Sequence, residues 1–237
     1  MSSNAINPCV GIVVQARLSS TRLPGKIFKD LAGGKSVVGY LIERLSTCTR
    51  VDRLIVATTT NPADDMLEAW LKQHNYLYYR GSEDDCLDRF YRASRIWGLD
   101  IIVRITSDCP LVVPDIVDDM ICYYLNNRQW IDYLSNRQHA NFPEGLDVEI
   151  FTFTMLEEAN HNANRQKERE HINYYFLDRD SRYRVRYYNH GERYDYSRFK
   201  LSIDTPEDLE QIKNLFAVKN LPLAFSFNEL TAVLTGA

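Results

Sequence analysis

The chain has 237 residues, with 28 Lys plus Arg against 32 Asp plus Glu and a formal net charge of −4. That balance argues against a dedicated duplex-DNA binder, which carries a basic excess, and we expect no nucleic-acid partner. Hydrophobic residues make up 45% and charged residues 25%, which excludes wholesale disorder. The five cysteines are odd in number and form no CxxC pair, so neither a disulfide framework nor a structural zinc site is expected.

The N-terminal segment lacks the charged and apolar regions of a signal peptide, and no run of 18 apolar residues is present. We therefore expect a cytoplasmic protein without a membrane contact. Residues 165–200 hold ten Lys or Arg against six Asp or Glu. Such a basic segment in an acidic chain indicates an anionic partner at one place.

The first 125 residues alternate between predicted strands and predicted helices. Short apolar, β-branched runs predict strands over residues 10–14, 53–58, 76–79 and 100–105. Apolar residues at helical spacing, with capping residues before them, predict helices from 36, from 62, over 85–97 and over 114–125. This alternation is typical of right-handed βαβ units in a parallel sheet.

The alternation is weaker after residue 130. Short strands are predicted over 130–134, 148–151, 183–188 and 200–203, and helices over 154–162, 170–177 and 206–216. No linker interrupts the chain, so we expect residues 1–237 to form a single domain. Within it, the segment around residues 130–200 is expected to be an arm for dimerisation or for an acceptor.

The loop that follows the first strand is the strongest candidate for ligand binding, because ligands of open α/β sheets bind beyond the carboxyl ends of the strands. Cations, hydroxyls and a glycine in such a loop can wrap a polyphosphate. A solvated surface loop is the alternative. The expected binding residues of this loop are Gln15, Ala16, Arg17, Ser19, Ser20, Thr21, Arg22, Gly25 and Lys26.

The sequence lacks two other common phosphate-binding motifs. No GxGxxG is present, and Gly33-Gly34-Lys35-Ser36 lacks the first glycine of a Walker A loop, because Lys29 stands at that position. We therefore expect this segment to be a turn followed by the start of a helix.

Two aspartates follow predicted strands. Asp108 comes after the strand over 100–105, and Asp204 comes after the one over 200–203. Aspartate is a usual ligand of Mg²⁺, which binds through one or two carboxylates plus phosphate oxygens. The alternative for Asp108 is a turn residue before Pro110, whereas Asp204 precedes the helix cap at Thr205 and is not needed for capping.

Several short motifs occur in one order along nearly the whole chain. Together they resemble the 3-deoxy-manno-octulosonate and acylneuraminate cytidylyltransferase superfamily, and most of all its spore-coat polysaccharide biosynthesis protein F branch. The motifs are Arg17-x-x-Ser20-x-Arg22-Leu23-Pro24-Gly25-Lys26, residues 80–89, Asp108-Cys109-Pro110, residues 145–149, Arg169-Glu170-His171 and residues 204–209.

This resemblance implies a nucleotide-diphospho-sugar transferase-like α/β fold, a three-layer αβα sandwich with a mostly parallel mixed sheet of about seven strands. It implies CTP as donor, Mg²⁺ as cofactor, release of pyrophosphate and a homodimer. Arg17, Arg22 and Lys26 would hold the triphosphate, and Asp108 and Asp204 would hold Mg²⁺. The remaining expected contacts to the nucleotide or the acceptor are Arg80, Ser82, Asp85, Arg104, Asp147, Glu149, Arg169 and His171.

The acceptor is not fixed by the sequence. An acidic sugar is the expected acceptor, with a sugar phosphate or phosphonate as the alternative. For the function as a whole, the alternatives are a glycosyltransferase or a non-catalytic nucleotide-sugar binding protein on the same fold. His171 is a candidate general base, and the alternative is a structural role beside the charged Arg169 and Glu170. The alternating Arg182, Arg184 and Arg186 either bind the acceptor's anionic group or form an exposed sheet face or a dimer contact. Stacking of single-stranded nucleic acid on the nearby tyrosines is a further alternative, which the acidic remainder of the chain disfavours.

Overall fold

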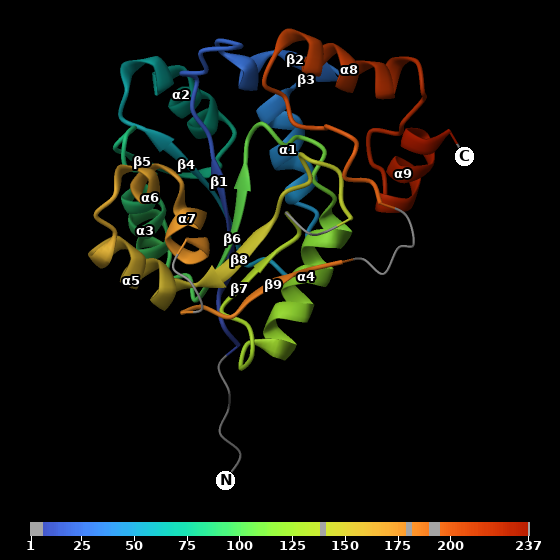
Figure 1. Ribbon diagram of the computed structural model, residues 1–237. Helices are drawn as coiled ribbons and strands as arrows, with labels where there is room; N and C mark the ends of the chain where they lie inside the picture. The colour runs from blue at the N-terminus through green and yellow to red at the C-terminus, as the bar shows by residue number, and fades with distance from the viewer. Residues whose placement is uncertain (1–6, 138–140, 179–181, 190–194, 237) are drawn as a thin grey trace.

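The computed structural model describes residues 7–137, 141–178, 182–189 and 195–236. In them, a seven-stranded sheet of order β5-β4-β1-β6-β8-β7-β9 lies between two layers of helices (Figure 1). The first four strands of this order are parallel, β8 is antiparallel to both of its neighbours, and β9 is parallel to β7. This confirms the predicted mostly parallel mixed sheet. Its strands are β1 (Val10–Gln15), β4 (Arg53–Thr59), β5 (Leu77–Gly81), β6 (Ile101–Thr106), β7 (Tyr133–Ser135), β8 (Glu149–Thr152) and β9 (Val185–Tyr187).

The helices cover both faces of the sheet, because side chains alternate between the faces along each strand. Ile12 and Val14 pack in one core with α1, α2, α4, α8 and α9, whereas Val13 packs in a second core with α3, α5 and α7. The helices are α1 (Val37–Leu45), α2 (Asp65–Gln73), α3 (Cys86–Ile96), α4 (Pro114–Asn127), α5 (Phe153–Asn162), α6 (Gln166–Glu170), α7 (Ile172–Leu177), α8 (Pro206–Ala217) and α9 (Phe227–Thr235).

Local signals explain several helix starts. The Ser36 hydroxyl accepts a hydrogen bond from the Gly39 amide and caps α1, and Gly33 and Gly34 both adopt positive φ in the turn before it. That turn joins two short strands, β2 (Asp30–Ala32) and β3 (Lys35–Ser36). Short 3₁₀ helices, η1 (Lys26–Phe28) and η2 (Pro62–Asp64), precede β2 and α2. Thr205 caps α8 as expected and forms a capping box with Asp208.

Some sequence predictions are wrong. Residues 201–203 form no strand, because the Leu201 amide donates to Glu144 O and the Ile203 amide to Asp108 O, so the segment bridges two loops in place of joining a ladder. The helix predicted over 170–177 is divided into α6 and α7 at His171, whose backbone is extended with φ −121°. The strand predicted from residue 130 begins at Tyr133, and α9 was not predicted.

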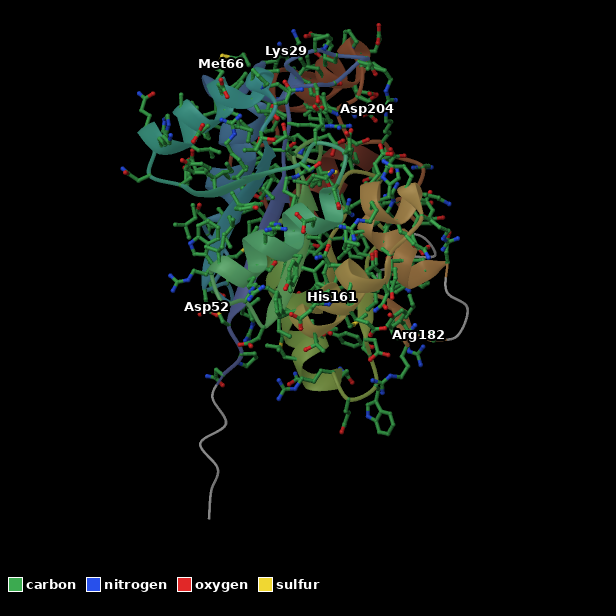
Figure 2. The ribbon with its side chains drawn as sticks, turned by 90° about the vertical axis from the view of Figure 1, so that its left-hand side faces the viewer. Lys29, Asp52, Met66, His161, Arg182 and Asp204 are labelled. Atoms are coloured by element: carbon green, nitrogen blue, oxygen red, sulfur yellow. The ribbon has the colours of Figure 1, made fainter. Side chains whose placement is uncertain are left out.

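A backbone crossing brings the segment before β8 onto the segment before α8. Gly145 has a φ of +95°, and a Cβ placed there would lie 2.3 Å from the Ser202 amide nitrogen. Only glycine fits such an approach. The crossing fixes residues 201–204 at the carboxyl ends of the parallel strands, and Figure 2 shows Asp204 and Lys29 toward one end of the molecule and Asp52 toward the other.

Within the described residues, no helix has the length and apolar character needed to cross a membrane.

Candidate active site

The loop after β1 is held in a fixed shape by its own apolar residues and by a buried carboxylate. Leu18 and Leu23 are buried beneath it. The Leu18 amide donates to Asp64 Oδ1 at 2.7 Å, and the Gly25 amide donates to Leu18 O at 3.2 Å. Gly25 adopts a φ of +66° at the start of η1, where glycine is favoured. The loop therefore presents its polar side chains in a set arrangement.

Lys26 joins the three segments of the site. Its Nζ donates to Ile203 O at 2.7 Å, to Asp108 Oδ2 at 3.2 Å and to Asp204 Oδ1 at 3.2 Å. Asp108 follows β6 and Asp204 precedes α8, so one buried ammonium connects the first loop to both. Arg22 Nη2 adds an ion pair with Asp204 Oδ1 at 2.9 Å. The residues that we expected to hold the triphosphate and the metal ion thus lie together.

The local charges keep Asp108 ionised. Burial by itself raises the pKa of this carboxyl, but the neighbouring Lys26 ammonium and hydrogen bonds from Thr106 and Lys26 outweigh burial and lower the pKa below its ordinary value. Asp108 therefore carries a full negative charge at neutral pH. An ionised carboxylate is the form that binds a divalent cation.

A cavity of about 340 Å³ opens over these residues, and we call it the loop cavity. It gathers ten of the residues expected from the sequence, together with Thr106 and Ser107, which the sequence analysis did not single out. The ten are Gln15, Arg17, Ser19, Ser20, Thr21, Arg22, Lys26, Asp108, His171 and Asp204. The expected residues Ala16 and Gly25 are not part of this lining, since Ala16 is buried and Gly25 lies at the turn that starts η1.

A carboxylate that the sequence analysis missed also holds the loop. Glu83 accepts hydrogen bonds from the Ser19 hydroxyl and from Asn61 Nδ2, the latter at 2.6 Å. Arg17 Nη1 lies 3.5 Å from Glu83 Oε1. The hydrogen bonds from Ser19 and Asn61 hold the pKa of Glu83 below its ordinary value. Only its position inside the motif over residues 80–89 pointed toward it, because the contact spans 64 residues of sequence.

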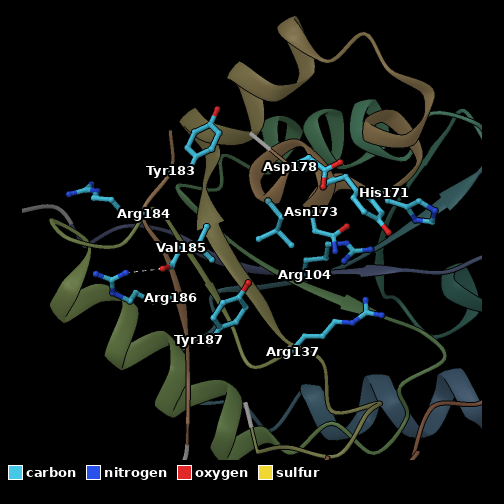
Figure 3. Close-up of a pocket in the computed structure, with 12 residues that line it drawn as sticks. Arg104, Arg137, His171, Asn173, Asp178, Tyr183, Arg184, Val185, Arg186 and Tyr187 are labelled. Carbon is cyan, nitrogen blue, oxygen red and sulfur yellow. Dashed lines mark hydrogen bonds between the residues drawn. The ribbon is translucent and has the colours of Figure 1, made fainter. Parts of the chain in front are cut away.

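A second cavity, of about 670 Å³, lies beside β9, and we call it the edge cavity (Figure 3). Residues from β6, α7 and β9 line it, together with Arg137. His171 lines both cavities. Of the predicted basic residues, Arg184 pairs with Asp132, with Nη2 2.7 Å from Oδ1, while Arg182 pairs with Glu158. Figure 3 draws the Arg104, His171 and Arg137 side chains on the opposite side of this cavity from Arg184 and Arg186.

Arg104 lies between the cavities in a buried network. Its guanidinium forms an ion pair with Glu149, and its Nη2 donates to Gln15 Oε1 at 3.1 Å. Glu149 is buried within the sheet, so its carboxylate faces Arg104. Asp147 Oδ2 lies 3.6 Å from Arg137 Nε, and burial raises the pKa of Asp147 to about 6.

The other expected contacts lie apart from the loop cavity and are engaged within the protein. Arg80 ties β5 to α2, with its Nη2 2.7 Å from Asp65 Oδ1 and its Nε donating to Thr59 O. Asp85 caps α3 and pairs with Arg169. The Ser82 hydroxyl accepts from the Asp85 amide at 3.3 Å. In this structure these side chains hold together the elements around the site.

The residues present fit Mg²⁺ only in part. Asp108 and Asp204 supply hard carboxylate oxygens, yet the described residues contain no group of three or more His, Cys, Asp or Glu side chains that could hold a metal ion. Mg²⁺ commonly takes one or two carboxylates and completes its shell with phosphate oxygens and water. The pair therefore suits a metal ion that arrives with a phosphate ligand.

Comparison with known proteins identifies the family. A family model described as cytidylyltransferase matches residues 11–235, which is nearly the whole chain. The chain belongs to the cytidylyltransferase family. Membership makes it a CTP-using nucleotidyltransferase, as the sequence analysis expected, and confirms that resemblance.

Relatives within the family cover most of this chain. It is 32% identical over 227 residues to the spore coat polysaccharide biosynthesis protein SpsF of Bacillus subtilis, covering 94% of this chain and 92% of the relative. It is 36% identical over 198 residues to an uncharacterised protein of Methanocaldococcus jannaschii, covering 84% of this chain and 79% of the relative.

Solved structures agree on the fold. A cytidylyltransferase from Leptospira borgpetersenii superposes with a TM-score of 0.88 at 35% identity, covering 96% of this chain and 94% of the other. A CMP:2-keto-3-deoxy-manno-octonic acid synthetase complexed with CTP gives a TM-score of 0.65 at 16% identity, covering 88% and 98%. These similarities confirm the expected fold, a mostly parallel mixed sheet between two layers of helices.

Proposed function

We propose that the chain transfers CMP from CTP to an acidic sugar and releases pyrophosphate. The observation that carries the proposal is the contact of Lys26 with both Asp108 and Asp204 beneath a loop that holds Arg17 and Arg22. These three cations and two carboxylates form one site from three distant segments. Membership of the family supports CTP as the donor.

The charges of the loop cavity suit a triphosphate bound with a metal ion. CTP carries about four negative charges near neutral pH. Arg17, Arg22 and Lys26 bring three positive charges, but within the protein these face Glu83, Asp204 and Asp108, so a metal ion would be needed to offset the charge of CTP. Asp108 and Asp204 would hold Mg²⁺, which when bound would neutralise charge that develops on the transferred phosphoryl group. The Ser20 and Thr21 hydroxyls line the same cavity and would add donors that need no counter-charge.

The edge cavity is the proposed acceptor site. It adjoins the loop cavity at His171, and its lining includes Arg137 on one side and Arg186 on the other. Arg186 forms no ion pair within the described residues, since the interaction found for its guanidinium is a hydrogen bond to Val185 O at 3.0 Å. Arginine recognises carboxylates and phosphates through two parallel hydrogen bonds, so a cavity lined by these arginines suits an acceptor with an anionic group.

The reaction asks for positioning and charge neutralisation more than for covalent chemistry by the protein. An acceptor oxygen attacks the α-phosphorus of CTP, the bond to the β-phosphate oxygen breaks, and pyrophosphate leaves. A hydroxyl acceptor must lose its proton. We assign the general base to His171, because its side chain lines both cavities.

Release of pyrophosphate tests this proposal. The purified protein is incubated with CTP, Mg²⁺ and single members of a panel of 2-keto-3-deoxy sugar acids, sugar 1-phosphates and phosphonates. We expect pyrophosphate with at least one sugar acid and none without an acceptor. If only sugar phosphates or phosphonates support the release of pyrophosphate, the sugar acid is excluded as acceptor. No release with any member would contradict nucleotidyl transfer to these classes.

A further inference from the structure

Gln15, Arg104 and Glu149 stand side by side on one face of the sheet. Val13 on β1 is in register with Arg104 on β6, and Arg104 is in register with Glu149 on β8. Gln15 follows Val13 by two residues, so its side chain emerges on the same face. Gln15 lines the loop cavity and Arg104 lines the edge cavity. Gln15 and Arg104 therefore form part of the wall between the cavities, and the buried Glu149 pairs with Arg104.

The Arg104–Glu149 pair is buried and charged. Arg104 is 8% exposed and Glu149 is 3% exposed. Burial by itself lowers the pKa of Arg104, but the Glu149 carboxylate outweighs burial and keeps the pKa above its ordinary value. A buried guanidinium held in this way has little freedom to turn, since its ion pair would be broken.

This geometry determines which end of the Gln15 amide faces the ligand. A guanidinium only donates hydrogen bonds, so the group that accepts from Arg104 Nη2 at 3.1 Å must be the amide oxygen of Gln15. A flipped amide would direct its NH₂ group at the guanidinium and lose this bond. No hydrogen bond from Gln15 Nε2 is found among the described residues, and Gln15 is half-buried beside the loop cavity. Its two N–H groups remain for a ligand.

We propose that Gln15 is a specificity-determining residue whose amide N–H donates to an anionic ligand oxygen at the wall between the cavities, with Arg104 and Glu149 as its positioning residues. This inference rests on the proposed function. The oxygen belongs either to the α-phosphate of the nucleotide or to the carboxylate of the acceptor, and both have the chemistry that a fixed N–H donor selects.

Three variants distinguish the loss of the N–H donor from the effect of an added negative charge and from misfolding. Gln15→Met keeps the length of the side chain and removes the amide. Gln15→Glu keeps an oxygen for Arg104 and replaces the NH₂ group by a second oxygen. Gln73→Glu is the matched control, since it makes the same charge change at an exposed position at the end of α2. Each protein is checked for an unchanged melting temperature.

Two measurements assign the source of the ligand oxygen. The first is the Kd for CTP with Mg²⁺ by calorimetry without acceptor, and the second is the KM for the sugar acid that supports pyrophosphate release. If the amide donates to a charged group, one of these two constants should rise about tenfold or more in both Gln15 variants, and neither should change in Gln73→Glu. A raised Kd for CTP assigns the oxygen to the nucleotide. An unchanged Kd with a raised KM assigns it to the acceptor.

A second experiment tests the role of the buried pair. Arg104→Gln combined with Glu149→Gln removes both charges together and leaves no buried charge unpaired. If the pair orients the amide, this double variant should lose as much ligand affinity as Gln15→Met does. Adding Gln15→Met to the double variant should then cause no further loss of affinity. Fully additive losses would overturn the positioning role.

Other outcomes overturn the inference as a whole. Wild-type Kd and KM values in Gln15→Met would exclude a ligand contact by the amide. A loss in Gln15→Glu without one in Gln15→Met would show an effect of charge alone. Failure of the unaltered protein to bind CTP and to release pyrophosphate would overturn the proposed function and this inference with it, and the wild-type arm reveals that case before any variant is compared.

Discussion

Replacing Lys26 by Met removes the ammonium that lies between Asp108 and Asp204 while keeping an unbranched side chain. The exposed fractions of these side chains are 11% for Lys26, 32% for Asp108 and 19% for Asp204. Removing one partner of a fully buried pair costs ~3–5 kcal/mol, and since Asp108 is about a third exposed we expect about 2–3 kcal/mol. That loss corresponds to a fall in Tm of about 5–10 °C for a chain of this size.

Mg²⁺ should restore part of this stability. Without Lys26, the two carboxylates repel each other, and a divalent cation can take the place of the ammonium. We therefore expect Mg²⁺ to raise the Tm of Lys26→Met more than that of the wild type, while pyrophosphate release falls ~100-fold or more because a triphosphate contact is lost. Differential scanning fluorimetry across a Mg²⁺ titration measures the first effect.

The neighbouring Lys29 supplies the control. Its side chain is exposed, so Lys29→Met makes the same change of charge and should stay within about 0.5 kcal/mol of the wild type. Equal stabilities of the two variants, or an equal response to Mg²⁺, would refute the reasoning that Lys26 holds two carboxylates in one site.

Three further predictions follow from single contacts. Asp108→Asn should lower pyrophosphate release ~100-fold or more, and it should lower Tm by less than Lys26→Met does because Lys26 keeps its contacts with Ile203 and Asp204. A rate near that of the wild type would remove Asp108 from the site. The folded pKa of Asp147, about 6, lies above its unfolded value, so its contribution to stability is present at low pH and is lost as pH rises through 6. Asp147→Asn should therefore gain about 1–2 kcal/mol relative to the wild type between pH 4 and pH 7 in urea unfolding, and a pH-independent difference would contradict the raised pKa. Gly145→Ala should destabilise the protein by about 3 kcal/mol or more because its Cβ would lie 2.3 Å from the Ser202 amide nitrogen, whereas Gly34→Ala, also at positive φ but with no atom within 4 Å, should cost only about 1–2 kcal/mol; equal costs would exclude the clash.

The sequence predicted the parallel half of the sheet well because each element there carries its own signal. Val10–Gln15 and Ile101–Thr106 are short, mostly apolar runs, and α1 and α3 begin at capping residues. The strand predicted over residues 200–203 was wrong. Leu201 and Ile203 are buried as strand residues would be, but their amides bond to separate loops, and the sequence pattern cannot show which partner an amide finds.

The candidate site divides in the same way. Residues close together in one loop, such as Arg17 and Lys26, were predicted to share a cavity because the loop follows a central strand. Glu83 and the Gln15–Arg104 contact were not predicted, since each joins residues far apart in sequence. Arg80 was expected at the ligand, but its guanidinium meets carboxylates of α2, a pairing that depends on the packing of α2 against β5.

Selective binding of CTP is the most direct test of the central claim that the loop cavity holds CTP and Mg²⁺. The protein is titrated by calorimetry with CTP, UTP, GTP and ATP, each with and without Mg²⁺, and its thermal stability is followed in parallel. We predict that CTP binds most tightly, that Mg²⁺ strengthens its binding, and that CTP at a hundred times its Kd adds about 2.7 kcal/mol to the free energy of unfolding. Equal affinity for all four nucleotides, or no binding of CTP in the presence of Mg²⁺, would contradict the account.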